Sequence, residues 1–198
     1  MLDLKPEHIS AYTLTLEKGT ELYQFVKKGE VAMPDEGQTG EWFLNTLGIL
    51  NSHGYPAYEI SNFARPGMEC RHNLHYWRIH PYLDFGPSAH GFDGRNRLGN
   101  VRSLDQYLTQ IESGNTPISM KDSLIQKNLT NELIGFGLRM NEGIDLAQIP
   151  ERYLNQFITY LESAREKWSD VLILRDSSVS LTKKGMVYTD AVGVDLML

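Results

Sequence analysis

The most distinctive stretch of the sequence runs Gly54-Tyr-Pro-Ala-Tyr-Glu-Ile-Ser-Asn-Phe-Ala-Arg-Pro-Gly-Met-Glu-Cys-Arg-His-Asn-Leu-His-Tyr-Trp77. It holds five aromatic rings, two histidines, two arginines, two glutamates and the only cysteine of the chain. Neither an amphipathic helix nor a half-buried strand is typically composed in this way. Rings mixed with imidazole, thiol and guanidinium groups favour a flat ligand or a packed polar junction. The strongest functional signal therefore lies in the first half of the chain.

The composition narrows the class of protein. The chain has 198 residues and a formal net charge of −6, which argues against general nucleic-acid binding because that needs a basic face. A single cysteine excludes an internal disulfide framework and fits a reducing cytoplasm. No apolar run approaches the roughly 20 residues of a membrane span, and the N-terminus lacks the pattern of a signal peptide. We therefore expect a cytoplasmic protein with no transmembrane segment.

Local patterns in the first half predict short strands and helices. Thr20 is placed to cap a helix over 21–28, and Pro34-Asp-Glu36 marks the start of a second helix that Gly54 stops. Ser103 with Gln106 forms a capping box for a third helix. Strands are expected where small or apolar residues alternate with polar ones. These expected strands cover residues 8–17, 55–63 and 74–79.

After Asn115-Thr-Pro117 the sequence changes to strong helical periodicity, so we expect a domain of residues 1–116 and a second of residues 117–198. Ser123 with Gln126 reads as a capping box before one amphipathic helix, and a second helix follows Pro150. A hairpin is expected around Asp176-Ser-Ser178. Thr182 is expected to cap a last helix that runs to about Ala191. Helix, helix, hairpin and helix together predict a winged-helix-like module.

Three kinds of site can be weighed in the ring-rich region. Cys70, His72, His75 and His80 have the spacing C-x-H-x2-H-x4-H, which matches no common zinc pattern and favours scattered polar histidines. Cys70 lacks the surroundings of a known cysteine nucleophile. A haem or porphyrin site remains open, because a neutral imidazole can ligate iron. Aromatic residues for a macrocycle and arginines for its propionates are both present: Tyr76, Trp77, Tyr82, Phe85, Arg65, Arg71 and Arg78.

Other catalytic signatures are absent from the sequence. Gly135-Phe-Gly137 lacks the third glycine of a dinucleotide fingerprint, and no Walker A sequence exists. Glu17, Glu59 and Asp84 form no evident acid–base pair. The expected C-terminal helices carry few basic residues, so a docking module is favoured over a DNA reader.

Several motifs resemble the HemW group of radical SAM proteins, a group also described as oxygen-independent coproporphyrinogen III oxidase-like. The central ones are Tyr58-Glu-Ile-Ser-Asn-Phe-Ala64, Cys70-Arg-His-Asn-Leu-His-Tyr-Trp77 and Phe85-Gly-Pro-Ser-Ala-His90. The H-N-x-x-Y-W run is the most specific of these motifs. Further matches to the same group occur across the rest of the chain, at His8–Thr20, Met33–Glu36, Gly137–Arg139, Gly143–Asp145 and Leu181–Gly185.

The resemblance implies an α+β fold: the end of a partial TIM-like radical SAM barrel, a sheet extension carrying the H-N-x-x-Y-W motif over residues 1–116, and a HemN-type C-terminal module over 117–198. Family members bind a [4Fe-4S] cluster and S-adenosylmethionine through C-x3-C-x2-C, which this sequence lacks. Three thiolates are needed to hold such a cluster. We therefore expect a C-terminal fragment that cannot perform radical chemistry without the N-terminal half of the barrel. The residues that the resemblance places near S-adenosylmethionine are Thr13, Thr15, Gly86, Ser88 and Ala89.

HemW-type proteins are understood as haem chaperones that deliver haem to acceptor proteins. Carried over, the motif makes His72 the leading iron ligand, with Asn73, Tyr76 and Trp77 around the haem. Two alternatives stay open: a coproporphyrinogen III oxidase that converts propionates to vinyl groups, and a structural half that only covers the barrel and binds a partner. Because the N-terminal half would supply barrel strands, we also expect self-association of this chain through exposed apolar surface.

Overall fold

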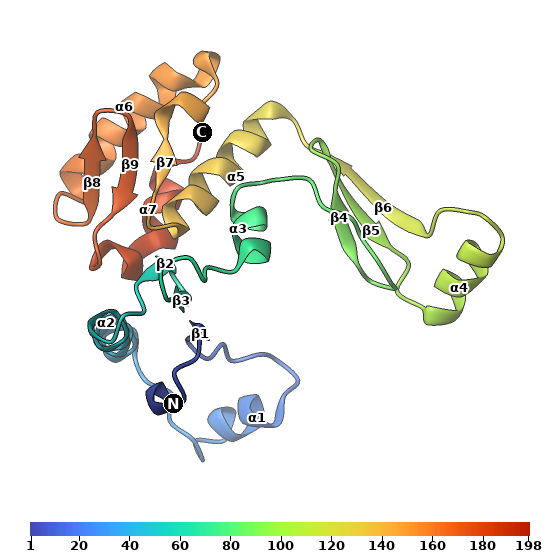
Figure 1. Ribbon diagram of the computed structural model, residues 1–198, viewed down its shortest axis with the longest axis horizontal. Helices are drawn as coiled ribbons and strands as arrows, with labels where there is room; N and C mark the ends of the chain where they lie inside the picture. The colour runs from blue at the N-terminus through green and yellow to red at the C-terminus, as the bar shows by residue number, and fades with distance from the viewer.

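The protein is an α+β chain of short elements, described over all residues 1–198 by a computed structural model (Figure 1). Three small antiparallel sheets are separated by helices, and no parallel strand pair occurs. The strands are β1 His8–Ser10, β2 Ala57–Glu59, β3 Asn62–Ala64, β4 His90–Phe92, β5 Asn96–Asn100, β6 Ile118–Ser123, β7 Ile144–Asp145, β8 Leu172–Arg175 and β9 Ser178–Leu181. The helices are α1 Glu21–Lys27, α2 Glu36–Ser52, α3 Arg71–Trp77, α4 Leu104–Glu112, α5 Gln126–Arg139, α6 Glu151–Lys167 and α7 Thr189–Leu196, with short 3₁₀ turns η1 Leu2–Leu4, η2 Leu146–Gln148 and η3 Gly185–Tyr188.

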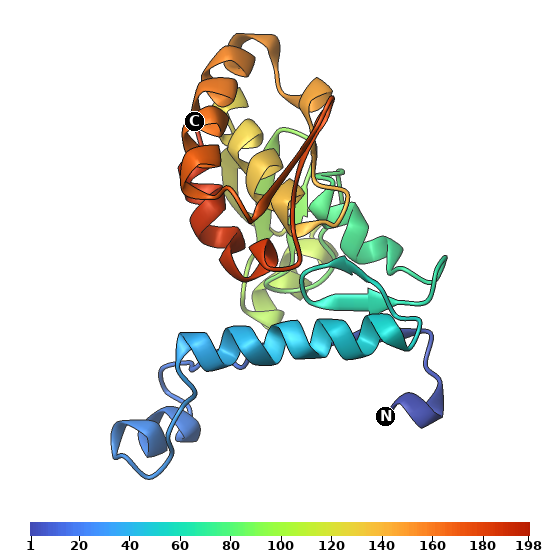
Figure 2. The same cartoon turned by 90° about the vertical axis from the view of Figure 1, so that its left-hand side faces the viewer.

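The first sheet has the order β1-β3-β2, and the long helix α2 lies along it (Figure 2). Helices α1 and α2 begin where the sequence predicted. Thr20 Oγ1 accepts from the Tyr23 N–H at the start of α1, and Asp35 Oδ1 accepts from the Gln38 N–H at the start of α2. The strand expected over 8–17 is too long. Only β1 pairs with β3, and after Ala11 the chain leaves the sheet towards α1 because no further strand lies beside it.

Two other strand predictions need correction. The expected strand 55–63 is a tight hairpin, β2 and β3, in which the pairing register shifts at Glu59. The expected strand 74–79 is wrong, because the chain forms α3, with the Leu74 N–H bonded to the Cys70 carbonyl. Its alternating pattern is short, and the same residues also satisfy helical spacing, as His72 and Tyr76 do at i and i+4.

The second sheet, β4-β5-β6, forms an arm that projects from the body and carries α4 at its tip (Figure 1). Ser103 Oγ accepts from the Gln106 N–H, as the capping pattern predicted. Strand β6 begins directly after Pro117 and pairs with β5 over its whole length, so this sheet contains residues from both sides of Pro117. The division of the chain into 1–116 and 117–198 stays a prediction.

The C-terminal part packs α5, α6 and α7 around the third sheet, β7-β9-β8, and the predicted hairpin is confirmed by β8 and β9. Its core is continuous with α2 and the first sheet; Ile134, Phe157 and Val179 are fully buried in it. Two caps differ from expectation. Ser123 ends β6, and Ile125 is the N-cap residue of α5. Thr182 Oγ1 accepts from the Gly185 N–H at the start of η3, whose N-cap residue is Lys184, and α7 follows η3.

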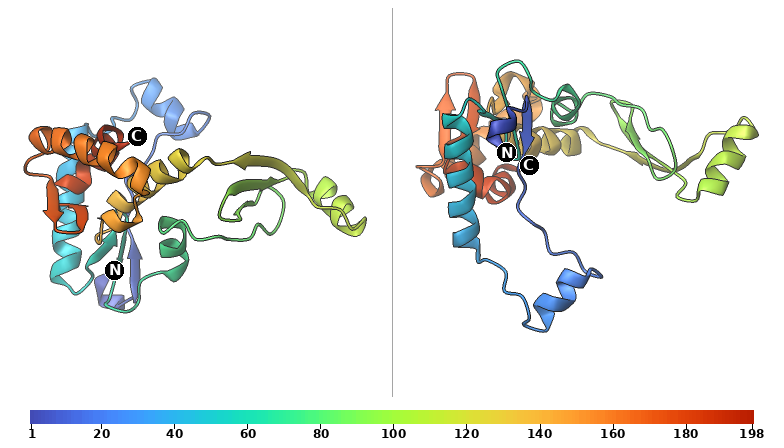
Figure 3. Two further views of the ribbon diagram at one scale, coloured as in Figure 1. Left: turned by 90° about the horizontal axis from the view of Figure 1, so that it is seen from above. Right: turned by 60° about the horizontal axis from the view of Figure 1, so that its bottom comes forward.

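The molecule has an open shape with a large surface. It exposes 12743 Å², whereas a compact protein of 22.6 kDa exposes about 9,500 Å². Figure 3 shows why: the arm and the segment around α1 project from the body in different directions. Several large apolar side chains on these projections face solvent, among them Tyr12, Leu14, Leu83, Phe85 and Leu104. None of the helices has both the length and the apolar character needed to cross a bilayer.

Candidate functional site

Helix α3 presents the H-N-x-x-Y-W residues on two different sides. Trp77 faces α5, where its ring meets Phe136 edge-on at 5.5 Å and the Arg139 guanidinium lies 5.1 Å from its centre. Asn73, one turn earlier, points to the first sheet. His72 and Tyr76 lie on the other side of the helix and are exposed. The helix therefore divides this motif into an anchored pair, Asn73 and Trp77, and an accessible pair, His72 and Tyr76.

The accessible pair continues into a row of rings that ends on the arm. The His72 ring meets Tyr76 edge-on at 4.7 Å, and Tyr76 meets Tyr82 at 4.5 Å. Tyr82 receives a hydrogen bond from Arg97, whose guanidinium also lies 4.3 Å from the centre of Phe92. These contacts fix the side of α3 against the base of the arm.

His72 differs from its neighbour His75 in the hydrogen bonding of its ring nitrogens. The Nε2 atom of His75 is bonded to the Pro81 carbonyl at 2.7 Å, and its ring contacts His80 at 5.0 Å. The ring of His72 is exposed and is held by its contact with Tyr76, with no protein hydrogen bond to either nitrogen. An imidazole with a free nitrogen is the form that can ligate a metal.

The anchored pair is tied to the first sheet through the Tyr58 hydroxyl. Asn73 Nδ2 donates to Tyr58 Oη at 3.3 Å, and His8 Nε2 lies 2.9 Å from the same oxygen. Burial raises the pKa of Tyr58 above its ordinary value of 10.0, so the hydroxyl stays protonated at neutral pH. One phenol thus joins β1, β2 and α3.

A cavity of about 320 Å³ lies behind Trp77, between α3, the first sheet and the end of α5. Glu59 is fully buried in its wall. Its Oε1 atom accepts from the Ser61 N–H at 3.0 Å and from the Asn62 side-chain amide, while Oε2 has no partner in the protein. Two donors in the same wall, Trp77 Nε1 and Arg139 Nε, are also buried without a partner. Such groups are uncommon in folded proteins and call for an explanation.

The residues expected near S-adenosylmethionine lie in two separate segments of this chain. Thr13 and Thr15 line a broad hollow of about 1110 Å³ beside α2 and η3. Gly86, Ser88 and Ala89 lie in the arm, where the Tyr107 hydroxyl accepts from the Gly86 N–H and Ser88 donates to the Val101 carbonyl. The two groups belong to segments that project apart (Figure 3).

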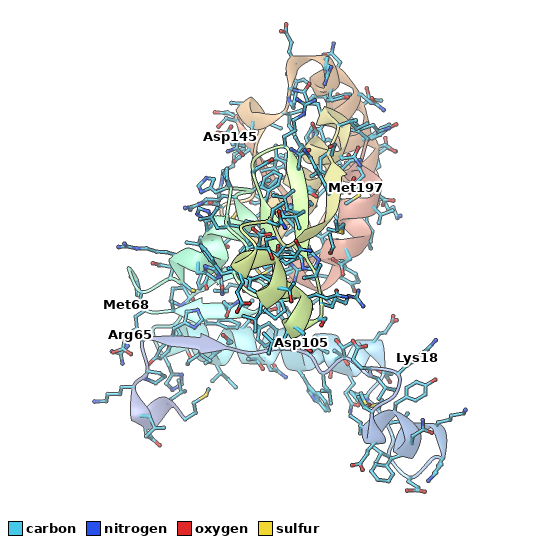
Figure 4. The ribbon with its side chains drawn as sticks, turned by 90° about the vertical axis from the view of Figure 1, so that its right-hand side faces the viewer. Lys18, Arg65, Met68, Asp105, Asp145 and Met197 are labelled. Atoms are coloured by element: carbon cyan, nitrogen blue, oxygen red, sulfur yellow. The ribbon has the colours of Figure 1, made fainter.

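The other sequence candidates are dispersed. Arg78 is paired with Glu142 through both of its carboxylate oxygens, and Arg65 donates to the Lys5 carbonyl and to the Tyr55 hydroxyl. Figure 4 places Arg65 with Met68 on the turn after β3, on the opposite side of the body from Lys18. Nowhere do three His, Cys, Asp or Glu side chains converge as a metal-binding group. With one cysteine, Cys70, these residues do not fit a [4Fe-4S] cluster.

Comparison with known proteins identifies the family. The family model described as HemN C-terminal domain matches residues 124–188. A protein named Heme chaperone HemW from Bacillus subtilis is 32% identical over 195 residues, which are 96% of this chain and 51% of that protein. Heme chaperone HemW from Mycobacterium tuberculosis is 33% identical over 94% of this chain and 46% of its own length. The chain contains a HemN C-terminal domain and is a relative of the HemW proteins.

A solved structure agrees with this assignment at the level of the fold. The coproporphyrinogen III oxidase HemN from Escherichia coli, described as a radical SAM enzyme, matches 98% of this chain with a TM-score of 0.71 and 17% identity, over 49% of its own length. The α+β arrangement corresponds to the C-terminal part of HemN. The chain spans about half the length of the curated HemW relatives that it matches.

Sequence reasoning missed two residues of the cavity wall, Glu59 and Arg139, and the Tyr58 hydroxyl that holds α3 to the first sheet. Glu59 showed no pairing partner in the sequence, Tyr58 carried no separate signal, and Arg139 stood out only as the end of a family-like tripeptide. Their roles depend on the isolated β-bridge between Glu59 and Met140, which brings β2 against the end of α5. A glutamate between β-forming residues in a buried hairpin was the one available signal.

Proposed function

We propose that this chain carries the haem-binding segment of a HemW-type haem chaperone, and that His72 is its iron ligand. The observation that carries the proposal is the exposed His72 imidazole, held edge-on against Tyr76 with neither nitrogen bonded to the protein. Relatives named Heme chaperone HemW support the same function. Haem is here the cargo, to be passed on to an acceptor protein in the cytoplasm.

The residues around His72 suit such a cargo. Tyr76 is 36% exposed and offers a ring beside the imidazole, and Tyr82 extends that surface. Asn73 donates to the Tyr58 hydroxyl and Trp77 packs against Phe136, so in this proposal both residues position the helix that carries His72. The side chain of Arg71, exposed at the start of α3, is available for a haem propionate.

A haem titration of this chain, followed by absorbance, tests the proposal. We expect a saturable Soret shift for the unchanged chain and an apparent affinity at least about tenfold lower for His72→Ala, since loss of an axial bond is worth more than 1.4 kcal/mol. His53→Ala is the matched control, because His53 is also exposed but lies at the end of α2. Equal titrations for the unchanged chain and His72→Ala would reject His72 as the ligand and favour a structural role for this half.

The enzymatic alternative is oxidation of coproporphyrinogen III, which the likeness to HemN favours at the level of fold. That chemistry needs a cluster held by three thiolates, which this chain alone does not provide. Thr13, Thr15 and the Gly86 turn would contribute to an S-adenosylmethionine site only together with residues outside this chain. Porphyrinogen turnover by a longer family protein, measured beside haem transfer to an acceptor, separates oxidase from chaperone.

The excess exposed surface supports a further part of the proposal: the chain self-associates when it is alone. Tyr12, Leu14 and Phe85 are more than 60% exposed, and burying side chains of this kind favours association. In a longer family protein, the N-terminal half of the barrel would cover part of this surface. A solution mass that stays monomeric at high protein concentration would contradict self-association.

A further inference from the structure

Arg97, on strand β5 of the arm, joins three separate parts of the molecule. Its Nη2 atom donates to Glu132 Oε2 on α5 at 2.7 Å, and its Nη1 atom donates to the Tyr82 hydroxyl at 2.9 Å. The guanidinium also lies 4.3 Å from the centre of the buried Phe92 ring. The side chains of Arg97 and Glu132 are only 22% and 26% exposed, so solvent and salt screen this ion pair less than the other pairs of the protein.

The shape of the guanidinium explains how one side chain holds these partners at once. It is planar and its donors point in fixed directions, so two N–H groups serve two acceptors while the flat face rests on a ring. Glu132 comes from α5 and Tyr82 from the segment that follows α3, whereas Arg97 itself lies on β5. A lysine has a single ammonium and therefore offers neither the fork nor the flat face. Arg97 thus fastens the base of the arm to the body in one orientation.

Tyr82 is fixed at both of its ends by these contacts. Its main chain exchanges two hydrogen bonds with Phe92, at 2.8 and 2.9 Å, and its hydroxyl accepts from Arg97. The ring between these ends supports Tyr76 edge-on at 4.5 Å, and Tyr76 supports His72 at 4.7 Å. We call His72, Tyr76 and Tyr82 the ring row. Because neither nitrogen of His72 is bonded to the protein, the direction of its imidazole depends on this row.

We propose that Arg97 is a positioning residue that holds the ring row in the arrangement presenting the His72 imidazole to haem iron, a role that rests on the proposed function of His72 as the ligand. Arg97 acts through Tyr82, whose hydroxyl it holds. The competing explanation is that Arg97 only fastens the arm. In that case its loss would leave the His72 ring where it is.

Histidine NMR of the chain without haem tests this positioning directly. With isotope-labelled histidine, the six Cε1–H signals can be separated, and His72→Ala identifies the signal of His72. The ring of Tyr76, edge-on at 4.7 Å, displaces this signal from the position of a free histidine. We expect Arg97→Met, which keeps an apolar stem but loses both donors, to move the signal towards that position. The signal of His53, at the end of α2, should stay unchanged.

The haem titration measures what this positioning contributes to binding. An observed affinity falls with the fraction of molecules in the binding-competent arrangement, so a fraction of one in three to one in ten makes the affinity of Arg97→Met about three- to tenfold lower. Tyr82→Phe keeps the ring but removes the acceptor, and should weaken binding in the same direction. The double variant should lose no more than Arg97→Met alone, because both changes break the same bond. Arg97→Lys keeps the charge opposite Glu132 without the fork, and should restore only part of the affinity.

Arg152→Met is the matched control for both measurements. Arg152 also has a side-chain acceptor, Gln126, and a ring, Tyr153, but both lie outside the ring row. This variant should leave the His72 signal and the haem affinity unchanged.

Two results would overturn the proposal. One is a His72 signal that is the same in Arg97→Met and in the unchanged chain. The other is a displaced signal together with an unchanged haem affinity. If Arg97→Met does not fold, the same two readings of Tyr82→Phe decide the question. Absence of haem binding by the unchanged chain overturns the haem function itself, and the NMR signal then still decides whether Arg97 orients His72.

Discussion

Replacing Tyr58 by phenylalanine should loosen the junction that positions α3. The hydroxyl is the common partner of His8 Nε2 and Asn73 Nδ2, at 2.9 and 3.3 Å. Each intramolecular hydrogen bond contributes about 0.5–1.5 kcal/mol, so losing both should lower the free energy of unfolding by about 1–3 kcal/mol. The phenyl ring keeps its packing against His8, with centres 5.7 Å apart, so no cavity term is added.

Urea unfolding followed by circular dichroism measures this loss. With a slope of about 2 kcal/mol per M, the midpoint should fall by about 0.5–1.5 M while the slope stays unchanged. Tyr160→Phe is the matched control, since its hydroxyl makes one exposed bond with Gln156 on α6, and it should change stability by less than about 0.5 kcal/mol. If the midpoint of Tyr58→Phe equals that of the control, the hydroxyl does not hold the junction. We expect the same variant to weaken haem binding, because α3 carries His72.

Three further variants test the C-terminal part. Gly143→Ala should cost at least about 2 kcal/mol in urea unfolding, because φ is +77° and a Cβ there would collide with the Val179 carbonyl. Phe157→Ala should cost about 3–5 kcal/mol in the same assay, because its ring is fully buried in the core. The hydrogen bond from Lys167 lowers the pKa of Asp195, so the stabilising effect of Asp195 is present above its unfolded pKa of about 3.9 and is lost as the pH falls through the lower folded value. Melting curves should therefore show Asp195→Asn as less stable at neutral pH and equal to the unchanged protein in strong acid.

The elements that could be predicted from sequence are those whose ends are fixed by local chemistry. Thr20, Asp35 and Ser103 cap α1, α2 and α4, and each bond involves residues three apart in the chain. The strands were harder, because a strand exists only where a partner lies beside it. Residues 12–17 alternate like a strand but pair with no other strand, so the chain there is irregular.

The candidate site was predictable only in part for a related reason. The motif indicated four residues, His72, Asn73, Tyr76 and Trp77. In a strand, alternate side chains of this motif would lie on the same face. As helix α3, it places His72 with Tyr76 and Asn73 with Trp77, so two residues face solvent and two face the body. Periodicity cannot decide between the two over seven residues, and contacts between distant segments, above all Trp77 with Phe136, select the helix.

The division of α3 into two sides separates the residues that hold the helix from the residue proposed to bind haem. Trp77 packs against Phe136 and Asn73 donates to the Tyr58 hydroxyl, and the same helix presents His72 to solvent. A variant that loosens the anchored side should therefore weaken haem binding although the imidazole is still present. If Tyr58→Phe lowers the stability but leaves the haem affinity unchanged, α3 stays in place without that hydroxyl, and the contacts of Trp77 with Phe136 and Arg139 suffice to position His72.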